Sequence, residues 1–306
     1  MSSLPSLMPR LRPDSDRTSR IDRFAWTSGT CFDAYGLRFG VRSNQPSLLE
    51  RLLPHLPPGW TPAPSPLVDQ LFSVWVEERA TPPGAARLYA GTRRALRVAT
   101  LGEVLTRLES EIRQGLAAGA RRRTFVHAGV VGHEGRAILV PGRSRSGKTT
   151  LVAELVRAGA IYYSDEFAVL DGRGRVHPFA KPLSVRGEGG CDVHARRTLP
   201  EELGGQSGHD PLPVGLVALA SYRKGGHWQP SSLTPGQAVL ELLTHTVPAR
   251  LRPEASLRAL ERAVSRAPVL KGDRGEAREL AAGLLGMVER TARTSRRPTA
   301  GERGMR

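Results

Sequence analysis

The stretch that decides the fold is ILVPGRSRSGKTTLVAELVRAGAIYYSDEFAVL, residues 138–170. Its apolar start, which Pro141 ends, predicts a buried strand, and the apolar residues of segment 149–158 then recur at helical spacing. A short turn leads into a second strand, which ends at Asp165 and Glu166. The order strand, loop, helix, strand predicts an α/β fold in which the end of the second strand returns beside the loop.

The loop between the first strand and the helix, residues 142–149, satisfies the pattern GxxxxGK[ST]. Glycines at both ends permit backbone angles at which successive N–H groups converge on an anion, and the helix adds its positive end. Lys148 supplies a cation for the β- and γ-phosphates of a nucleotide, and the hydroxyl of Thr149 suits Mg²⁺. A plain glycine turn, with the loop arginines facing solvent, is the alternative. The flanking strand and helix favour binding of ATP with Mg²⁺, through Gly142, Arg143, Ser144, Arg145, Ser146, Gly147, Lys148, Thr149 and Thr150.

The acid pair at the end of the second strand predicts metal binding and proton transfer. Two carboxylates are costly to bury unless cations compensate them, and Mg²⁺ and Lys148 are such cations. One acid can hold the metal, directly or through water, while the other accepts the proton of an attacking hydroxyl. We assign catalytic roles to Lys148, Asp165 and Glu166 and metal ligation to Thr149 and Asp165, and leave open which acid is the base. The alternative is an exposed acidic turn.

His127 lies in the apolar strand FVHAGVV, residues 125–131, which precedes the loop strand. A lone histidine on an apolar strand usually indicates a core position. However, VHAGVV followed by GRSRSGKTTLVAELVRAGAIYYSDEFAVL resembles the P-loop core of HPr kinase/phosphorylase, over about residues 122–190. The resemblance implies that His127 is an active-site histidine, that Asp165 lies near the metal and that Glu166 is the proton acceptor.

Two further segments, GLRFGVRSN (36–44) and GDRGEARELAAGLL (272–285), resemble a broader bacterial group of HPr-kinase-like proteins, which includes kinases encoded with lasso peptides. The chain departs from HPr kinase itself at several points. The acid pair is Asp-Glu rather than Asp-Asp, and Ala128 stands where the family has glycine. Ser184 takes the place of a metal-binding glutamate, for which Glu188 is a nearby substitute. Since the N-terminal segment also does not resemble the family's regulatory domain, HPr is not the expected substrate.

The resemblance implies an α/β fold with a P-loop nucleotide-binding core of the HPr kinase / PEP carboxykinase type, an N-terminal α/β portion and C-terminal helices. Alternating apolar residues predict a strand over 33–43, and helical spacing predicts a helix over 101–120. The predicted segments are a disordered leader at 1–20, the N-terminal portion at 21–120, the P-loop domain at 121–290 and a disordered basic tail at 291–306.

Composition limits the class of partner. The net charge of +16 comes almost wholly from arginine, because the chain has only the lysines 148, 181, 224 and 271. This charge is spread along the chain, and an aromatic content of 5% offers few platforms for stacking bases, so nucleic acid is not the expected partner. No apolar run is long enough to span a membrane, and the N-terminus lacks the apolar core of a signal peptide. We therefore expect a cytoplasmic protein, with Cys31 and Cys191 as reduced thiols.

Three functions agree with these patterns. The leading expectation is an ATP-dependent phosphotransferase that acts on a serine or another hydroxyl of a small protein or peptide. The second is an ATP-binding or NTPase module without transfer, and the third is a basic protein that binds nucleic acid or acidic partners. The sequence leaves a homo-oligomer open.

Overall fold

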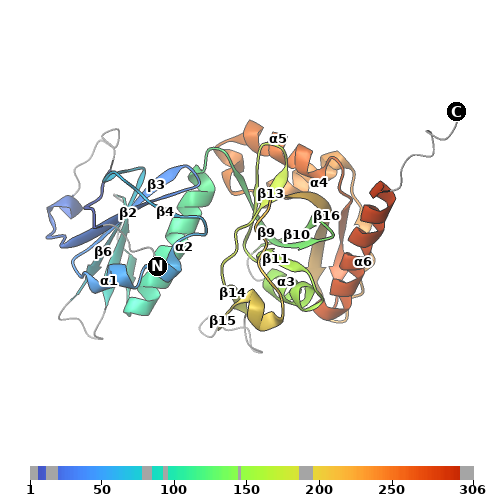
Figure 1. Cartoon of the computed structure of the whole chain (residues 1–306), viewed down its shortest axis with the longest axis horizontal. Helices are drawn as coiled ribbons and strands as arrows, with labels where there is room; N and C mark the ends of the chain where they lie inside the picture. The colour runs from blue at the N-terminus through green and yellow to red at the C-terminus, as the bar shows by residue number, and fades with distance from the viewer. Residues whose placement is uncertain are drawn as a thin grey trace, which may run out of the picture. The chain divides into compact units, whose positions relative to one another are not determined.

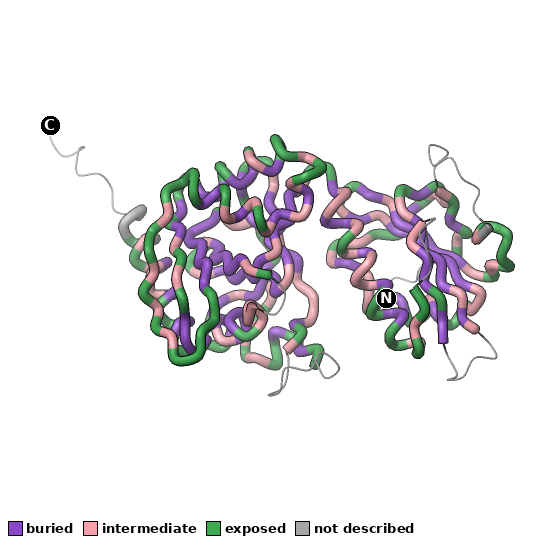
Figure 2. The backbone as a smooth tube through the Cα atoms, turned by 180° about the vertical axis from the view of Figure 1, so that it is seen from behind, coloured by how far each residue is buried: buried purple, intermediate pink, exposed green. Residues whose placement is uncertain are grey.

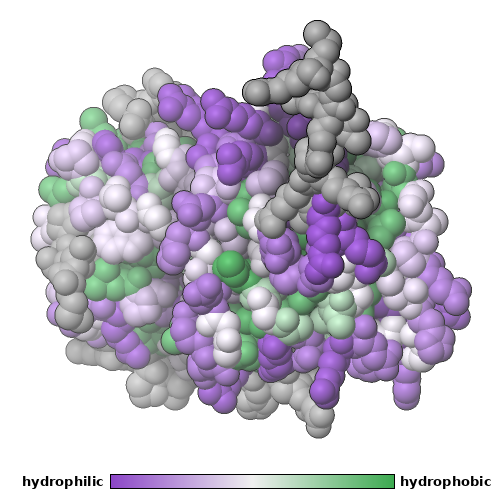
Figure 3. Space-filling model, turned by 45° about the vertical axis from the view of Figure 1, so that its right-hand side comes forward, coloured by the Kyte–Doolittle hydropathy of each residue, from purple (hydrophilic) through white to green (hydrophobic). Residues whose placement is uncertain are grey.

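The computed structural model describes residues 6–11, 20–77, 85–91, 96–143, 146–185 and 196–296. The chain folds into two compact units, Met1–Arg122 and Arg123–Arg306 (Figure 1). Both units combine β-sheet with α-helix, so the predicted mixed α/β class is confirmed. Along the described residues, no helix has the length and apolar character needed to cross a bilayer. Hydrophilic residues cover most of the face shown in Figure 3, with apolar residues between them in small groups.

The first unit is built on a six-stranded sheet, against which α2 (Leu101–Gly119) packs. The α2 helix begins after Thr100, whose hydroxyl accepts a hydrogen bond from the N–H of Glu103, as expected for a helix cap. Its apolar residues recur every three or four positions and are buried, including Val104, Leu108 and Ile112. The strands in sheet order are β4 (Thr61–Pro62), β2 (Ser28–Ala34), β3 (Leu37–Ser43), β6 (Gln70–Val76), β7 (Ala86–Ala90) and β8 (Leu96–Val98).

The strand predicted over residues 33–43 is confirmed at 37–43, but its continuity is wrong, because a turn separates residues 33 and 34 from the rest. The β2 and β3 strands pair antiparallel on either side of Tyr35 and Gly36, whose φ angles are 50° and 81°. Positive φ at both central residues is the geometry of a tight hairpin turn whose twist matches that of the strands. Glycine accepts this angle readily, whereas tyrosine rarely does, so the residue pair did not signal a turn.

The segment predicted as a disordered leader is partly ordered. The β1 strand (Arg10–Leu11) pairs in parallel with β5 (Leu67–Val68), and Pro9 lies so close to Gly29 that a Cβ there would be 2.5 Å from the proline ring. Residues 1–5 and 12–19 lie outside the described residues. Cys31 is a buried free thiol in this unit, and Cys191 also lies outside the described residues.

The second unit is built on an eight-stranded sheet in which β10, β16 and β18 run parallel side by side. The β9 strand is antiparallel to β10 on one side and to both β11 and β12 on the other. The strands are β9 (Thr124–His133), β10 (Arg136–Pro141), β11 (Ile161–Ser164), β12 (Phe167–Leu170), β13 (Arg175–His177), β16 (Leu212–Tyr222), β17 (Ser231–Ser232) and β18 (Val269–Arg274). A separate two-stranded sheet joins β14 (Leu183–Val185) to β15 (Arg196–Thr198).

Helices cover both faces of this sheet. Along β10, Ala137 and Leu139 pack into a cluster with residues of α4 and α5, whereas Ile138 and Val140 pack into a cluster with α3 and α6. Side chains of a strand alternate between the two faces, so four successive apolar residues predict a strand buried on both sides. Figure 2 shows these strands as a buried centre. The helices are α3 (Lys148–Arg157), α4 (Pro235–Leu243), α5 (Pro253–Val264) and α6 (Ala277–Arg296).

The C-terminal helix is longer than the predicted segments allow. The α6 helix continues to Arg296, which is six residues into the segment predicted as a disordered tail, and residues 297–306 lie outside the described residues. The side chains of Leu284 and Val288 on this helix are buried against α3 and the sheet. Packing of this apolar face accounts for a helix that continues into a polar, arginine-rich sequence.

Candidate active site

The two glycines of the loop after β10 are required by its close contacts. A Cβ atom at Gly142 would lie 2.5 Å from the Oγ atom of Ser146. Gly147 caps α3 with a φ of 80°, and a Cβ there would lie 2.5 Å from Nη2 of Arg274. The backbone angle therefore favours glycine at the second position, and a Cβ atom at either position would force the Ser146 or Arg274 side chain to shift. Ser144 and Arg145, in the middle of the loop, lie outside the described residues.

Lys148 begins α3, and its side chain folds back over the loop. Its ammonium group donates hydrogen bonds to the carbonyl oxygens of Gly142, at 2.8 Å, and Arg143, at 2.6 Å. The cation and the N–H groups of the first helical turn therefore produce a positive potential at one place. Thr150, predicted as part of the same site, is exposed in this first turn.

A single strand, β9, separates the loop from the acid pair. Pro141 on β10 pairs with Ala128 on one side of β9, and on the other side the N–H of Ala128 donates to the carbonyl oxygen of Glu166 at 3.1 Å. Neighbouring strands lie about 4.8 Å apart, so two strand spacings, about 10 Å, separate the two backbones. The long side chains of the loop and of the acids can cross this distance. The prediction that the second strand ends beside the loop is thus confirmed.

Asp165 is the most enclosed acid of the site, with 5% of its surface exposed. Its Oδ2 atom accepts hydrogen bonds from the hydroxyl of Thr149, at 3.1 Å, and from the N–H of Ser184, at 3.3 Å. Its Oδ1 atom accepts from the hydroxyl of Tyr162, at 3.1 Å, and from the ammonium group of Lys181, at 3.0 Å. Four donors therefore compensate the burial of one carboxylate. Burial and the neighbouring Asp165 together raise the pKa of Tyr162.

Lys181 connects the two acids, and the sequence reasoning missed it. Its ammonium group lies 3.0 Å from Oδ1 of Asp165 and 3.6 Å from Oε2 of Glu166, and its side chain is 12% exposed. The hydroxyl of Tyr162 also lies 2.8 Å from the carbonyl oxygen of Lys181, so its one proton is shared between this oxygen and Oδ1 of Asp165. One sequence signal existed: lysine is rare in this chain, and Lys148, Lys181 and Lys271 all lie at or beside this site.

Two histidines lie beside the loop. The N–H of His127 donates to the carbonyl oxygen of His245 at 2.7 Å, and the carbonyl oxygen of His127 accepts from the N–H of Gly142 at 3.2 Å. The imidazole of His127 also packs against the ring of Phe167, with 4.9 Å between ring centroids. His127 therefore lies where it was predicted. His245 was missed because it follows α4, more than a hundred residues along the chain, in a segment without a motif.

The electrostatic environment keeps both imidazoles neutral. Burial lowers the pKa of His127, and the charge of Lys148 lowers it further, while the carboxylate of Glu166 opposes both. Burial likewise lowers the pKa of His245, with the charges of Lys148 and His127 adding to it. Each ring therefore has one N–H donor and one nitrogen acceptor near neutral pH.

Arg274 at the end of β18 supports the loop from behind, and the sequence reasoning also missed it. Its guanidinium group donates from Nη2 to the carbonyl oxygen of Gly147, at 3.1 Å, and from Nη1 to that of Gly275, at 2.9 Å. The side chain is 3% exposed and lies over the ring of Tyr222, 5.4 Å from its centroid. Burial lowers its pKa, while the charge of Glu276 opposes this.

A cavity of about 690 Å³ opens in front of the loop. Its walls come from the carboxyl ends of β10 and β16, from Lys271 on β18 and from the end of α4. Ligands of α/β proteins bind at this edge of parallel strands. The lining residues are Pro141, Gly142, Arg143, Ser146, Gly147, Leu219, Ala220, Ser221, Tyr222, Glu241, Thr244, His245 and Lys271.

The chain matches no protein-family model and no curated protein. The chemistry of the site therefore follows from its own residues. Among the described residues, no group of three or more His, Cys, Asp or Glu side chains is placed to hold a metal ion. A divalent ion here would need oxygen atoms from outside the protein, and the phosphates of a nucleotide and water are such donors.

Proposed function

We propose that this chain is an ATP-dependent phosphotransferase that moves the γ-phosphoryl group of ATP to a hydroxyl, on a serine of a small protein or peptide. The observation that carries the proposal is the hydrogen bond between Thr149 and Asp165, which joins the glycine-bracketed loop to the acid pair. A loop for phosphates, a hydroxyl beside a carboxylate and a second carboxylate are the parts that phosphoryl transfer requires. The resemblance of residues 122–190 to the core of HPr kinase/phosphorylase supports the same reaction.

Each residue has a separate task in the proposed reaction. Lys148 and the N–H groups at the start of α3 bind and orient the β- and γ-phosphates. Glu166 accepts the proton of the acceptor hydroxyl, because its backbone is fixed to β9 and its side chain is only partly buried. Lys181, whose ammonium group lies between the two carboxylates, orients both acids.

The residues of the site fit Mg²⁺ bound together with ATP. Thr149 and Asp165 present a hydroxyl and a carboxylate oxygen 3.1 Å apart, and both are hard oxygen donors of the kind that Mg²⁺ prefers. These two side chains would hold the ion, which when bound neutralises phosphate charge. Lys181 occupies the other oxygen of Asp165, so Oδ2 is the atom that faces the loop.

The test separates binding from transfer. Calorimetry with Mg·ATP measures binding, and γ-labelled ATP with a serine-containing peptide library measures label on peptide against released phosphate. We expect the wild type to bind ATP and label peptide, and Lys148→Ala to lose both. Glu166→Gln should keep binding within a few-fold and lose 10²–10⁴-fold in transfer, about 3–5 kcal/mol. Lys224→Ala is the matched control, because this lysine is exposed in the turn after β16.

Three results would overturn parts of the proposal. A wild type that does not bind Mg·ATP contradicts it entirely. Equal binding by Lys148→Ala and Lys224→Ala rejects the loop as the phosphate site. Transfer that survives in both Glu166→Gln and Asp165→Asn rejects the assignment of the acids.

A second candidate is an ATP-binding or NTPase module that releases phosphate without transferring it. The contact that favours it is the ion pair between Lys181 and Glu166, since a carboxylate held by a cation 3.6 Å away is less free to turn towards an acceptor hydroxyl. The labelling experiment distinguishes the two, because this candidate predicts released phosphate and no labelled peptide. If the ion pair is inhibitory, Lys181→Met should increase the amount of labelled peptide.

A further inference from the structure

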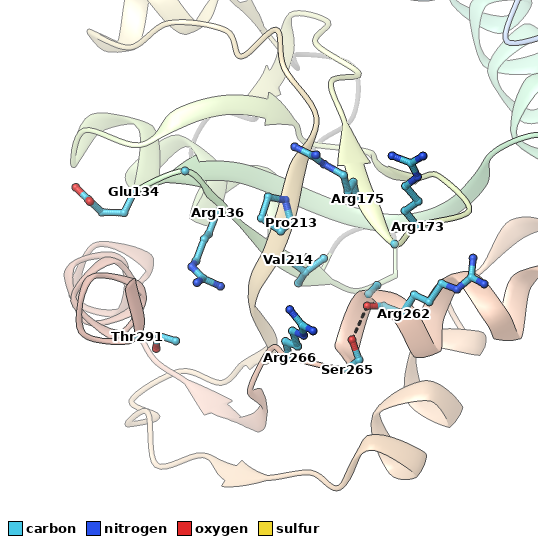
Figure 4. Close-up of a pocket in the computed structure, with 13 residues that line it drawn as sticks. Glu134, Arg136, Arg173, Arg175, Pro213, Val214, Arg262, Ser265, Arg266 and Thr291 are labelled. Carbon is cyan, nitrogen blue, oxygen red and sulfur yellow. Dashed lines mark hydrogen bonds between the residues drawn. The ribbon is translucent and has the colours of Figure 1, made fainter. Parts of the chain in front are cut away.

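A second cavity, of about 860 Å³, lies at the opposite end of the β10 and β16 strands from the loop (Figure 4). It contacts Arg136, the first residue of β10, and Val214, the third residue of β16, whereas the cavity at the loop contacts their last residues. The two cavities have no lining residue in common. The second is lined by Glu134, Gly135, Arg136, Arg173, Gly174, Arg175, Pro213, Val214, Arg262, Ala263, Ser265, Arg266 and Thr291.

Arginine is concentrated in this second cavity, which we call the arginine cavity. Five of its thirteen lining residues are arginine, whereas the whole chain has 41 arginines among 306 residues. The only acid in the lining is Glu134. These arginines come from three separate parts of the chain: the start of β10, the β12–β13 turn with β13, and the C-terminal end of α5. The general basicity of the sequence does not explain this density.

Backbone contacts orient the arginines without neutralising them. Arg262 donates to the carbonyl oxygen of Gly172, and Arg175 donates to that of Pro211. Within the part of the chain that the structure describes, four of the five arginines, all except Arg136, form no ion pair with a carboxylate. A guanidinium group has five N–H donors, so one bond to a carbonyl leaves others for a ligand. Like charges held together repel, and a bound anion relieves this repulsion.

The shape of the arginine cavity suits a small molecule. Val214 and Ala263 are buried and form an apolar base beside Pro213. Figure 4 shows Arg136 and Arg266 directed into the same space, in front of the start of β16. A volume of about 860 Å³ lies within the range of small-ligand pockets, roughly 300–1,000 Å³. Two or more guanidinium forks can therefore bind one ligand at the same time.

We propose that the arginine cavity binds a small, multiply charged anion that carries at least two phosphate or carboxylate groups. Planar guanidinium groups bind both groups through two parallel N–H···O bonds, which single ammonium groups cannot form. A single monovalent anion would leave most of the positive charge of the four arginines other than Arg136 uncompensated, so a ligand with several anionic groups is the better match. This site does not depend on the proposed phosphotransferase activity, because it shares no residue with it.

The test uses inorganic tripolyphosphate and citrate as probes, with binding measured by calorimetry on the full chain. Every protein in this test carries Lys148→Ala, so that the loop after β10 does not compete with the cavity for the probes. In this background we compare Arg262→Gln/Arg266→Gln with the control Arg258→Gln/Arg278→Gln, which removes the same charge from exposed positions on α5 and α6. We expect one bound anion per chain. Its affinity should fall about tenfold or more in the cavity variant and less than about twofold in the control. The tighter probe identifies phosphate or carboxylate as the preferred group.

Two results would reject the arginine cavity as an anion site. One is equal weakening in both double variants, which indicates only a general attraction of the basic surface. The other is a lack of binding of both probes at millimolar concentration and low salt. Circular dichroism and thermal unfolding check that the variants fold. If the double variant does not fold, Arg173→Gln replaces it, since this exposed side chain has no hydrogen bond to the described part of the chain.

Discussion

The hydroxyl of Thr149 donates a hydrogen bond of 3.1 Å to the carboxylate of Asp165, so the first turn of α3 is joined directly to the end of β11. The α3 helix follows β10, and β10 and β11 pair with opposite sides of β9. These pairings position both the helix and the end of β11. A buried carboxylate with four donors resists displacement, so the contact holds the loop and the acid pair in a fixed relation. Preorganisation of this kind is what phosphoryl transfer needs from a protein.

The Thr149 hydroxyl can be tested by two substitutions. Thr149→Ala removes the donor to Asp165 and the proposed Mg²⁺ ligand, whereas Thr149→Ser keeps both. We expect Thr149→Ala to weaken binding of ATP in the presence of Mg²⁺ by about tenfold or more, and Thr149→Ser by less than about threefold. Calorimetry with and without Mg²⁺ measures this. Equal affinities of the two variants at saturating Mg²⁺ would show that the hydroxyl does not take part in metal binding.

Gly147 should be harder to replace than Gly159, a glycine that also has a positive φ angle. Gly147 and Gly159 have φ angles of 80° and 97°, so alanine is strained at both, by about 1–2 kcal/mol. Only at Gly147 would the added Cβ also meet Arg274, whereas nothing lies within 4 Å at Gly159. Gly147→Ala should therefore lower the free energy of unfolding by about 1 kcal/mol more than Gly159→Ala.

Urea unfolding followed by fluorescence measures both changes. Arg274→Ala/Gly147→Ala completes a double-mutant cycle, in which the excess cost of Gly147→Ala should disappear. Equal costs for the two glycine variants would mean that Arg274 moves aside freely, and the support of the loop by this side chain would be rejected.

The part of the site that lies within one continuous segment could be predicted from sequence. Residues 138–170 contain the strand, the loop, the helix and the returning strand, and a local sequence pattern predicts each of them. A strand buried on both faces must be apolar at successive positions, and a helix after a glycine loop must present its first N–H groups to that loop. These are short-range constraints, so they determine the positions of Lys148, Thr149 and Asp165 relative to one another.

The contacts that come from distant parts of the chain could not be predicted. Lys181, His245 and Arg274 reach the site through strand pairing and helix packing, which depend on tertiary structure and leave no local pattern. Single positively charged residues between strands usually face solvent, so their burial cannot be read from composition. The hairpin at Tyr35 was missed for a different reason, since a residue that rarely adopts positive φ does so here.

The two histidines predict how stability depends on pH. Their pKa values are lowered from 6.5 in the folded chain, so below about pH 6.5 the unfolded chain binds protons that the folded chain does not. Their contribution to stability is therefore complete above pH 6.5 and is lost as the pH falls towards the folded values. We expect the urea midpoint to decrease between pH 7.5 and 5.5, and the decrease to be smaller in His127→Gln/His245→Gln.

Salt separates the two causes of this pH dependence. Burial is the main cause of both shifts and is insensitive to salt, whereas the contribution of Lys148 is electrostatic and is screened in part. Most of the pH dependence should therefore remain in 0.5 M NaCl, an ionic strength at which the Debye length is only about 4 Å. A wild type and a double variant with the same pH profile would exclude the histidines as its source.

Arg274 should be irreplaceable even by lysine. Its guanidinium group spans two carbonyl oxygens, those of Gly147 and Gly275, and a single ammonium group cannot reach both with the same geometry. Arg274→Lys should therefore lower the free energy of unfolding by about 1–3 kcal/mol, because a buried charge keeps only part of its hydrogen bonds. Since Gly147 caps α3, the variant should also weaken binding of ATP.

Arg278→Lys, the same change at an exposed position on α6, should leave both the free energy of unfolding and the affinity for ATP within error. If Arg274→Lys weakens ATP binding without a loss of stability, Arg274 contacts the phosphates directly; if it changes neither quantity, its role in supporting the loop is refuted.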